Sequence, residues 1–152
     1  MPIKPIDLSL WVTRVKEKAP KAFRLVGRAG DMQSAMNNGT TVCPSLFFLP
    51  PSYTAGAVAH ATGQFTAQEV NCQVTALYTA RHYQDPKRGK AAEQLEVLQE
   101  ALWSALVGFT PSDRTTGGTV RYVRGQLTRI DAKKAQVWYA DTFAIPVQFR
   151  NV

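Results

Sequence analysis

The sequence has no long apolar run and no leader-like segment at its amino terminus. No stretch approaches the roughly 20 apolar residues that a membrane-spanning helix needs. The first residues, Met1-Pro-Ile-Lys-Pro-Ile-Asp7, lack the apolar core of a signal peptide. We therefore expect a soluble protein that is made in a cytoplasm and has no membrane partner.

The chain is also poor in metal-ligating and redox-active side chains. Its cysteines are Cys43 and Cys72 and its histidines are His60 and His82, and no two of them have the spacing of a zinc site. Both cysteines fall in stretches with the pattern of strands, where buried free thiols are the default in a reducing compartment. The sequence therefore predicts no metal, no cofactor and no disulfide.

Catalytic motifs are missing as well. The sequence contains no Gly-x-Ser-x-Gly turn, no His-Glu-x-x-His pair and no Walker loop. Gly27-Arg-Ala-Gly30 matches the GxxG loop that clamps nucleic-acid backbones, but a plain turn explains four residues better. Glu93, Glu96 and Glu100 share one helical face and indicate a solvated or docking surface rather than an acid–base pair. We therefore expect that the protein is not an enzyme.

Two main helices are predicted by apolar residues at helical spacing. The first begins after an N-cap at Asp7 and ends at Pro20. Its apolar face consists of Leu8, Trp11, Val12 and Val15. The second begins at Asp85-Pro86 and ends at Gly108. Its apolar stripe consists of Leu95, Leu98, Leu102 and Leu106.

Five stretches have patterns typical of strands. They cover residues 22–26, 41–49, 64–83, 119–130 and 136–149, the last two forming a hairpin, and a short helix is expected at 31–36. Residues 52–63 are small and polar and indicate an exposed loop. This order favours an α+β fold, with a mainly antiparallel sheet, the two main helices packed on one face and a long C-terminal β-hairpin. We expect residues 1–152 to form a single domain.

The closing strand alternates between two rows of side chains. One row is apolar apart from one carboxylate, and it consists of Val137, Tyr139, Asp141, Phe143, Ile145, Val147 and Phe149. We expect this row to pack on the helix that bears Leu98 and Leu102. A buried Asp141 needs a cationic or hydrogen-bonding partner, and an arginine of the adjoining strand is the expected one. Trp138 lies on the other row, where a large aromatic suits an interface, and Pro146 indicates an edge strand.

The chain is basic, with 18 Lys and Arg against 11 Asp and Glu and a net charge of +7. The positive charge is best organised near the C-terminal hairpin, since residues 114–130 contain arginines but no acid. The candidate contact residues there are Arg121, Arg124, Arg129, Lys133 and Lys134. Such a surface suits an anionic partner, and a solubilising role explains it equally well.

The order of the elements resembles the bacteriophage tail terminator family, most closely terminators of Mu-like and long non-contractile-tailed phages. The corresponding pieces are the helix from Asp7, the strand Pro44-Ser-Leu-Phe-Phe-Leu-Pro50, the strand 70–83, Asp85-Pro-Lys-Arg-Gly-Lys-Ala-Ala92, Leu106-Val-Gly-Phe-Thr-Pro111 and Trp138-Tyr-Ala-Asp-Thr-Phe143. The resemblance covers nearly the whole chain, and residues 52–63 depart from it.

The resemblance implies a structural virion protein at the head–tail junction. Terminators form six-fold rings on the end of the tail tube, stop its polymerisation, join the head-completion proteins and let the genomic DNA pass through the lumen. In such a ring the hairpin cations face the DNA channel or an acidic neighbouring subunit, and Trp138 contacts a subunit or the tube. Another head–tail connector subunit, such as a head-closure or tail-completion protein, and a basic nucleic-acid-binding module remain open alternatives.

Overall fold

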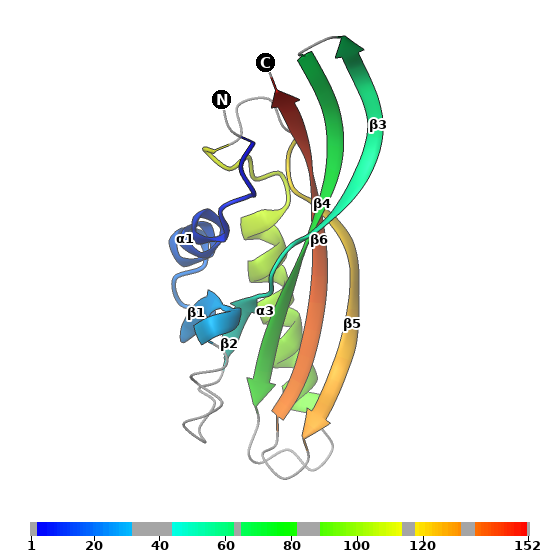
Figure 1. The fold of residues 1–152 in the computed structure, drawn as a ribbon. Helices are drawn as coiled ribbons and strands as arrows, with labels where there is room; N and C mark the ends of the chain where they lie inside the picture. The colour runs from blue at the N-terminus through cyan, green and yellow to red at the C-terminus, as the bar shows by residue number, and fades with distance from the viewer. Residues whose placement is uncertain are drawn as a thin grey trace.

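Two helices lie on one face of a six-stranded sheet in the computed structural model (Figure 1). The structure describes residues 3–31, 44–62, 65–81, 89–113, 118–131 and 136–151. The elements follow the order α1 (Leu8–Lys18), β1 (Leu25–Arg28), β2 (Ser45–Phe48), β3 (Ser52–Thr62), β4 (Phe65–Arg81), α3 (Gly89–Leu106), β5 (Arg121–Asp131) and β6 (Gln136–Asn151). The predicted α+β class, the largely antiparallel sheet and the C-terminal hairpin are confirmed.

The strands are ordered β1-β2-β4-β6-β5, and β3 pairs with β4 off this path. Only β1 and β2 run parallel among the pairs of the described strands. Strand β2 pairs with residues 76–79 of β4 and β3 pairs with residues 65–73, so that both lie along the same edge of β4. Strands β1 and β5 therefore form opposite edges of the sheet.

The expected loop at 52–63 is wrong, because residues 52–62 form β3. Its alanines and glycine have low strand propensity, but a long neighbouring strand can impose extended structure that propensity does not favour. Register shifts between Ala55 and Val58 and between Val58 and His60 mark β-bulges, where an extra residue bends a strand.

The closing strand is long, as predicted, but it is not an edge strand. Strand β6 pairs with β4 from residue 136 to 151 and with β5 from residue 136 to 144. Pro146 lies beyond Ala144, the last residue that pairs with β5, so none of the described strands pairs with that side of β6 there. Proline lacks a backbone N–H, and a position without a strand partner on that side tolerates its absence.

The helices bury one row of β4 and one row of β6. The β6 row is the predicted one, and Phe143, Ile145 and Val147 join the core with Leu98 and Leu102 of α3, which are 2% and 0% exposed. We call this side of the sheet the helix face and the other side the open face. Register places Val70, Cys72, Val74, Ala76 and Tyr78 of β4 on the helix face. Cys72 is buried, as expected for a cysteine in this strand.

The helix ends have the predicted capping residues. Asp7 accepts a 2.9 Å hydrogen bond from the Ser9 N–H, and this cap begins α1. The Ser9 hydrogen bonds hold the pKa of the Asp7 carboxyl below its usual value. Gly108 follows α3 with φ +86°, a left-handed conformation that glycine adopts without strain. The predicted cap at Asp85 and most of the helix at 31–36 lie outside the described residues.

Candidate functional site

Strand β5 carries its arginines on one side because of two bulges. The register of β5 with β6 shifts between Tyr122 and Arg124 and again between Leu127 and Arg129. Strict alternation would send Arg124 to the side opposite Arg121 and Arg129. One extra residue at each shift instead aligns Arg121, Arg124 and Arg129 with the open-face residues Ala144, Thr142 and Trp138. The bulge residue Thr128 donates a 3.1 Å hydrogen bond to the Trp138 carbonyl.

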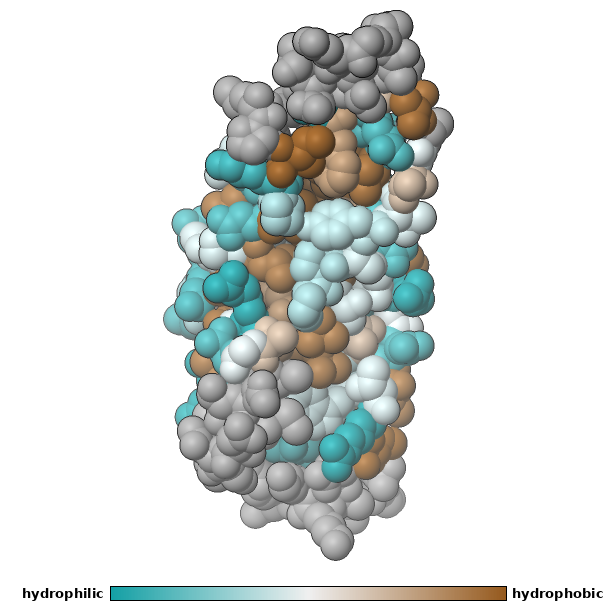
Figure 2. Space-filling view, in the orientation of Figure 1, coloured by the Kyte–Doolittle hydropathy of each residue, from teal (hydrophilic) through white to brown (hydrophobic). Residues whose placement is uncertain are grey.

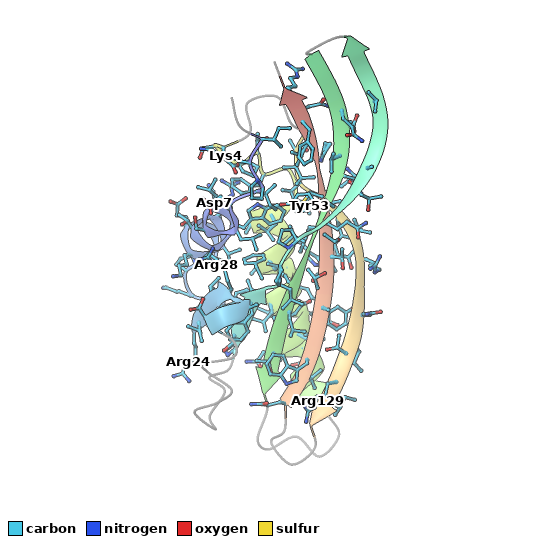
Figure 3. The ribbon with its side chains drawn as sticks, viewed as in Figure 1. Lys4, Asp7, Arg24, Arg28, Tyr53 and Arg129 are labelled. Atoms are coloured by element: carbon cyan, nitrogen blue, oxygen red, sulfur yellow. The ribbon has the colours of Figure 1, made fainter. Side chains whose placement is uncertain are left out.

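We call Arg121, Arg124 and Arg129 the arginine face. All three side chains are exposed, and Figure 3 shows Arg129 near the lower end of β5. Their β6 partners span six residues, so the three arginines extend over about 20 Å along the strand. Among the described residues, no carboxylate lies on the open face of β4, β5 and β6 between the rungs of Arg121 and Arg129. The arginine face is therefore a row of positive charge.

Polar side chains surround this row on the open face. Arg121 Nη2 donates a 3.0 Å hydrogen bond to Asn71 Oδ1, and Thr75 Oγ1 lies 3.4 Å from Thr142 Oγ1. The predicted cations Lys133 and Lys134 lie outside the described residues. The structure thus brings together three of the five basic residues chosen from the sequence.

Trp138 lies on the open face, as predicted, but it is largely buried. Its side chain is 7% exposed, and its register partners are Thr79 on β4 and Arg129 on β5. Buried Phe47 lies on the same face, since it pairs with Leu77 of β4. Trp138 therefore offers a partner only a small part of its surface.

Asp141 is buried on the helix face, but its expected arginine partner is wrong. The carboxylate is 0% exposed and accepts 2.8 Å hydrogen bonds from Tyr78 Oη and Trp103 Nε1 at the same oxygen, Oδ2. Tyr122 Oη donates to Oδ1 at 3.4 Å. The arginines of β5 point to the open face and cannot reach it. Three neutral donors from α3, β4 and β5 therefore satisfy this buried charge.

Burial sets the protonation of this cluster. It raises the pKa of the Asp141 carboxyl, and the hydrogen bonds from Trp103, Tyr78 and Tyr122 oppose that rise. Burial also raises the pKa of Tyr78, and the hydrogen bond to Asp141 adds to the shift. Burial raises the pKa of Tyr122 as well, so both Tyr78 and Tyr122 stay protonated and their hydroxyl groups donate to the carboxylate. The cluster ties α3, β4 and β5 to β6.

Gly125 makes room for the cluster. It pairs with Asp141 across the hairpin. A Cβ at this position would overlap Asp141 Oδ1, Tyr122 Oη and Tyr139 Cε1. This close approach could not be predicted from the sequence, because a glycine inside a strand has several possible reasons.

The described residues do not form a metal site or a membrane span. No three His, Cys, Asp or Glu side chains among them are placed to hold a metal ion. Neither of the two described helices is long and apolar enough to cross a membrane. The arginine face is a surface feature that suits assembly with other molecules.

Comparison with known proteins agrees with such a role. The model of the phage tail terminator protein family matches residues 1–151. The chain belongs to the phage tail terminator family. This terminator-family chain is therefore a structural protein of a phage-like virion, where it assembles with other tail components.

Two further comparisons complete this result. No curated protein matches the chain. Among solved structures, a chain from the virion of a native gene transfer agent particle is similar, with 14% identity and a TM-score of 0.46, over 89% of this chain and 84% of that one.

Proposed function

We propose that the chain acts as a single domain that forms a hexameric ring on the end of the phage tail tube. The ring stops polymerisation of the tube protein and gives the head-completion proteins a surface to bind. Its lumen lets the genomic DNA pass between head and tail. Membership of the tail terminator family is the observation that carries this proposal.

The arginine face supports a place for DNA in this proposal. Its charges are exposed and lie on one side of the sheet, and no described residue between the rungs of Arg121 and Arg129 places a carboxylate on that side. Passing DNA presents a dense row of phosphates, which Arg binds without reading the sequence. In the proposed ring the open face lines the lumen, with Lys133 and Lys134 extending the basic surface. An acidic neighbouring subunit is the alternative partner.

Trp138 joins this surface as the proposed contact with a subunit or with the tube. Its side chain lies on the same face as Arg129. A largely buried aromatic beside polar groups fits the periphery of an interface better than its centre.

Electron microscopy of tail ends tests the ring. A reconstruction from particles that carry this chain should show a closed ring of copies at the head-proximal end of the tube. A single copy per tail would overturn the proposal.

Infectious yield tests the arginine face. The double variant Arg121→Gln, Arg124→Gln should lower the infectious yield. The double variant Lys18→Gln, Lys21→Gln is the control, because it removes the same charge from exposed positions at the end of α1 and just after it. Equal yields from the two variants would mean that the arginines only solubilise the chain.

A further inference from the structure

Exposed apolar side chains gather along β5 and the end of α3. Of the ten large apolar residues that are exposed in the described part of the chain, six lie here. We call them the β5 rim: Trp103, Val107, Tyr122, Val123, Leu127 and Ile130. Their exposed fractions run from 36% for Trp103 to 51% for Leu127. Such gathering is unusual on a free surface and marks an interaction site.

Several members of the β5 rim are brought together by the fold. The rings of Trp103 and Tyr122 lie 5.1 Å apart, and a hydrogen bond from Gly108 N–H to the Val120 carbonyl brings the end of α3 beside the start of β5. Leu127 and Ile130 share the helix face with Tyr122. Along the right border of Figure 2, where β5 runs in Figure 1, teal and brown side chains alternate. The strand thus presents arginines to one side and apolar groups to the other.

Acidic side chains border the β5 rim on α3. Glu93, Glu96 and Glu100 are exposed, and residues 91–107 contain no lysine or arginine. A partner that covers the rim must therefore offer apolar groups together with positive charge.

The opposite edge of the same chain offers both. A groove of about 480 Å³ runs between α1 and β1. We call it the α1–β1 groove, and its lining is Ser9, Val12, Lys16, Leu25, Val26, Gly27, Arg28 and Asp31. Lys16 and Arg28 are exposed at its border, and Asp31 accepts a 2.8 Å hydrogen bond from the Arg28 N–H. In Figure 3, Arg24 and Arg28 lie on this side of the molecule, away from β5.

We propose that the β5 rim of one copy seats in the α1–β1 groove of the next copy. This inference rests on the proposed ring and names the surfaces that join its subunits. The apolar rim covers Val12, Leu25 and Val26, while Glu96 and Glu100 approach Lys16 and Arg28. Because β1 and β5 are opposite edges of one sheet, the contact is head to tail and can close into a ring.

Two other contacts are disfavoured. Two rims facing each other would oppose the glutamates of α3, and two grooves would oppose their cations, and like charges at an interface are repulsive. Addition of a strand to β5 is disfavoured because its two bulges interrupt a regular edge. The charge complementarity of groove and rim leaves a second copy as the occupant.

Photo-crosslinking of the purified chain tests the contact directly. Benzoylphenylalanine at Leu127 should crosslink to residues 9–28 of another copy, identified in a mixture of ¹⁴N and ¹⁵N chains. The same group at Val58, exposed on β3 outside the rim, is the control and should not reach those residues. Crosslinks from Leu127 to the β5 of another copy would overturn the proposal. So would the absence of any crosslink between copies at the highest soluble concentration.

Mixing two variants tests the head-to-tail geometry. Leu127→Asp with Ile130→Asp disables the rim, and Lys16→Glu with Arg28→Glu disables the groove. Each variant alone should associate at least about 30-fold more weakly than the wild type, since buried anchors of an interface carry most of its affinity. The two together should form a dimer through one intact contact and grow no further. A groove variant that dimerises by itself would reject the geometry.

Capping of tail tubes is scored separately. Protein that crosslinks as expected but does not cap tubes leaves the contact standing and rejects its proposed place on the tail. Protein that caps tubes without the crosslink rejects only the contact.

Discussion

Trp103 Nε1 donates a 2.8 Å hydrogen bond to Asp141 Oδ2 and so joins α3 to the middle of β6. The same oxygen accepts from Tyr78 on β4. The hydrogen bond fixes how α3 lies on the sheet, and it places the Trp103 ring beside Tyr122 at the edge where the β5 rim begins.

Loss of this hydrogen bond should destabilise the fold through Asp141. Trp103→Phe is expected to lower the free energy of unfolding by about 1.5–3 kcal/mol, because a bond to a charged group is lost. In a double-mutant cycle with Asp141→Asn, measured by urea denaturation, the two changes should couple by at least about 1 kcal/mol. Trp11→Phe is the control, since its buried indole nitrogen has no hydrogen-bond partner in the described structure. Equal coupling of both tryptophans to residue 141 would contradict the assignment.

The buried carboxyl should give stability a particular pH dependence. Burial raises the pKa of Asp141 above its ordinary value of 3.8, so the folded protein holds this proton more tightly than the unfolded chain. The resulting stability is fully present below the pKa that Asp141 has in the unfolded chain. It is lost as the pH rises through the higher pKa that Asp141 has in the folded protein. From about pH 3.8 upward, the free energy of unfolding of the wild type should fall relative to that of Asp141→Asn. Urea denaturation of both proteins at several pH values measures this difference. If their free energies of unfolding change in parallel with pH, the pKa of Asp141 is not raised.

A methyl group at Gly125 should disturb the same cluster. Gly125→Ala is expected to cost about 1–3 kcal/mol, because the new Cβ overlaps Asp141 and Tyr122. Gly30→Ala is the matched control, since a Cβ there meets nothing within 4 Å. Thermal melts of the two variants should differ clearly. If they agree, the close approach at Gly125 is not a constraint.

The arginine face should bind DNA through phosphate contacts. The double variant Arg121→Gln, Arg124→Gln is expected to reduce the steepness of the salt dependence, the slope of the log association constant for duplex DNA against log salt concentration, by about 2. Each lost phosphate contact lowers the magnitude of this slope by about 0.9. Lys18→Gln with Lys21→Gln removes equal charge elsewhere and should leave the slope nearly unchanged. Fluorescence anisotropy at several salt concentrations gives both slopes. Equal losses from the two variants would indicate that only net charge matters.

Trp138 requires two substitutions, because it is both buried and a proposed contact. Trp138→Ala should lower the free energy of unfolding by about 3–5 kcal/mol, as for other buried aromatics. Trp138→Phe should stay folded and show weaker tail capping, since the smaller ring presents less surface to a partner. Circular dichroism and capping assays separate the two effects. Normal capping by folded Trp138→Phe would remove this residue from the proposed interface.

Periodicity was enough to predict much of the fold. The row from Val137 to Phe149 and the stripe of Leu98 and Leu102 each bury their apolar residues, and the structure packs them together. Strand β3 was missed because its pairing with β4 overrides weak local preferences. Its small residues carry no signal of that pairing.

The site was harder to predict, because it depends on register. A residue count cannot show the bulges in β5, and without them the arginines do not share a face. The donors to Asp141 come from Tyr78, Trp103 and Tyr122, far apart in the chain, and only the folded structure brings them together.

The bulges of β5 also determine which mutations can move its charge. A substitution at Arg124 removes one cation but leaves its neighbours where they are. Deletion of the extra residue itself, Val123 or Thr128, would restore regular alternation and leave the arginines on one face. Loss of a bulge without a change in length would instead move every residue on one side of it to the opposite face, so that arginines change sides with Leu127 or Tyr122. In this strand, changes that remove a bulge rather than substitutions of the arginines themselves are therefore the route by which a relative could move the positive charge to the other side of the sheet.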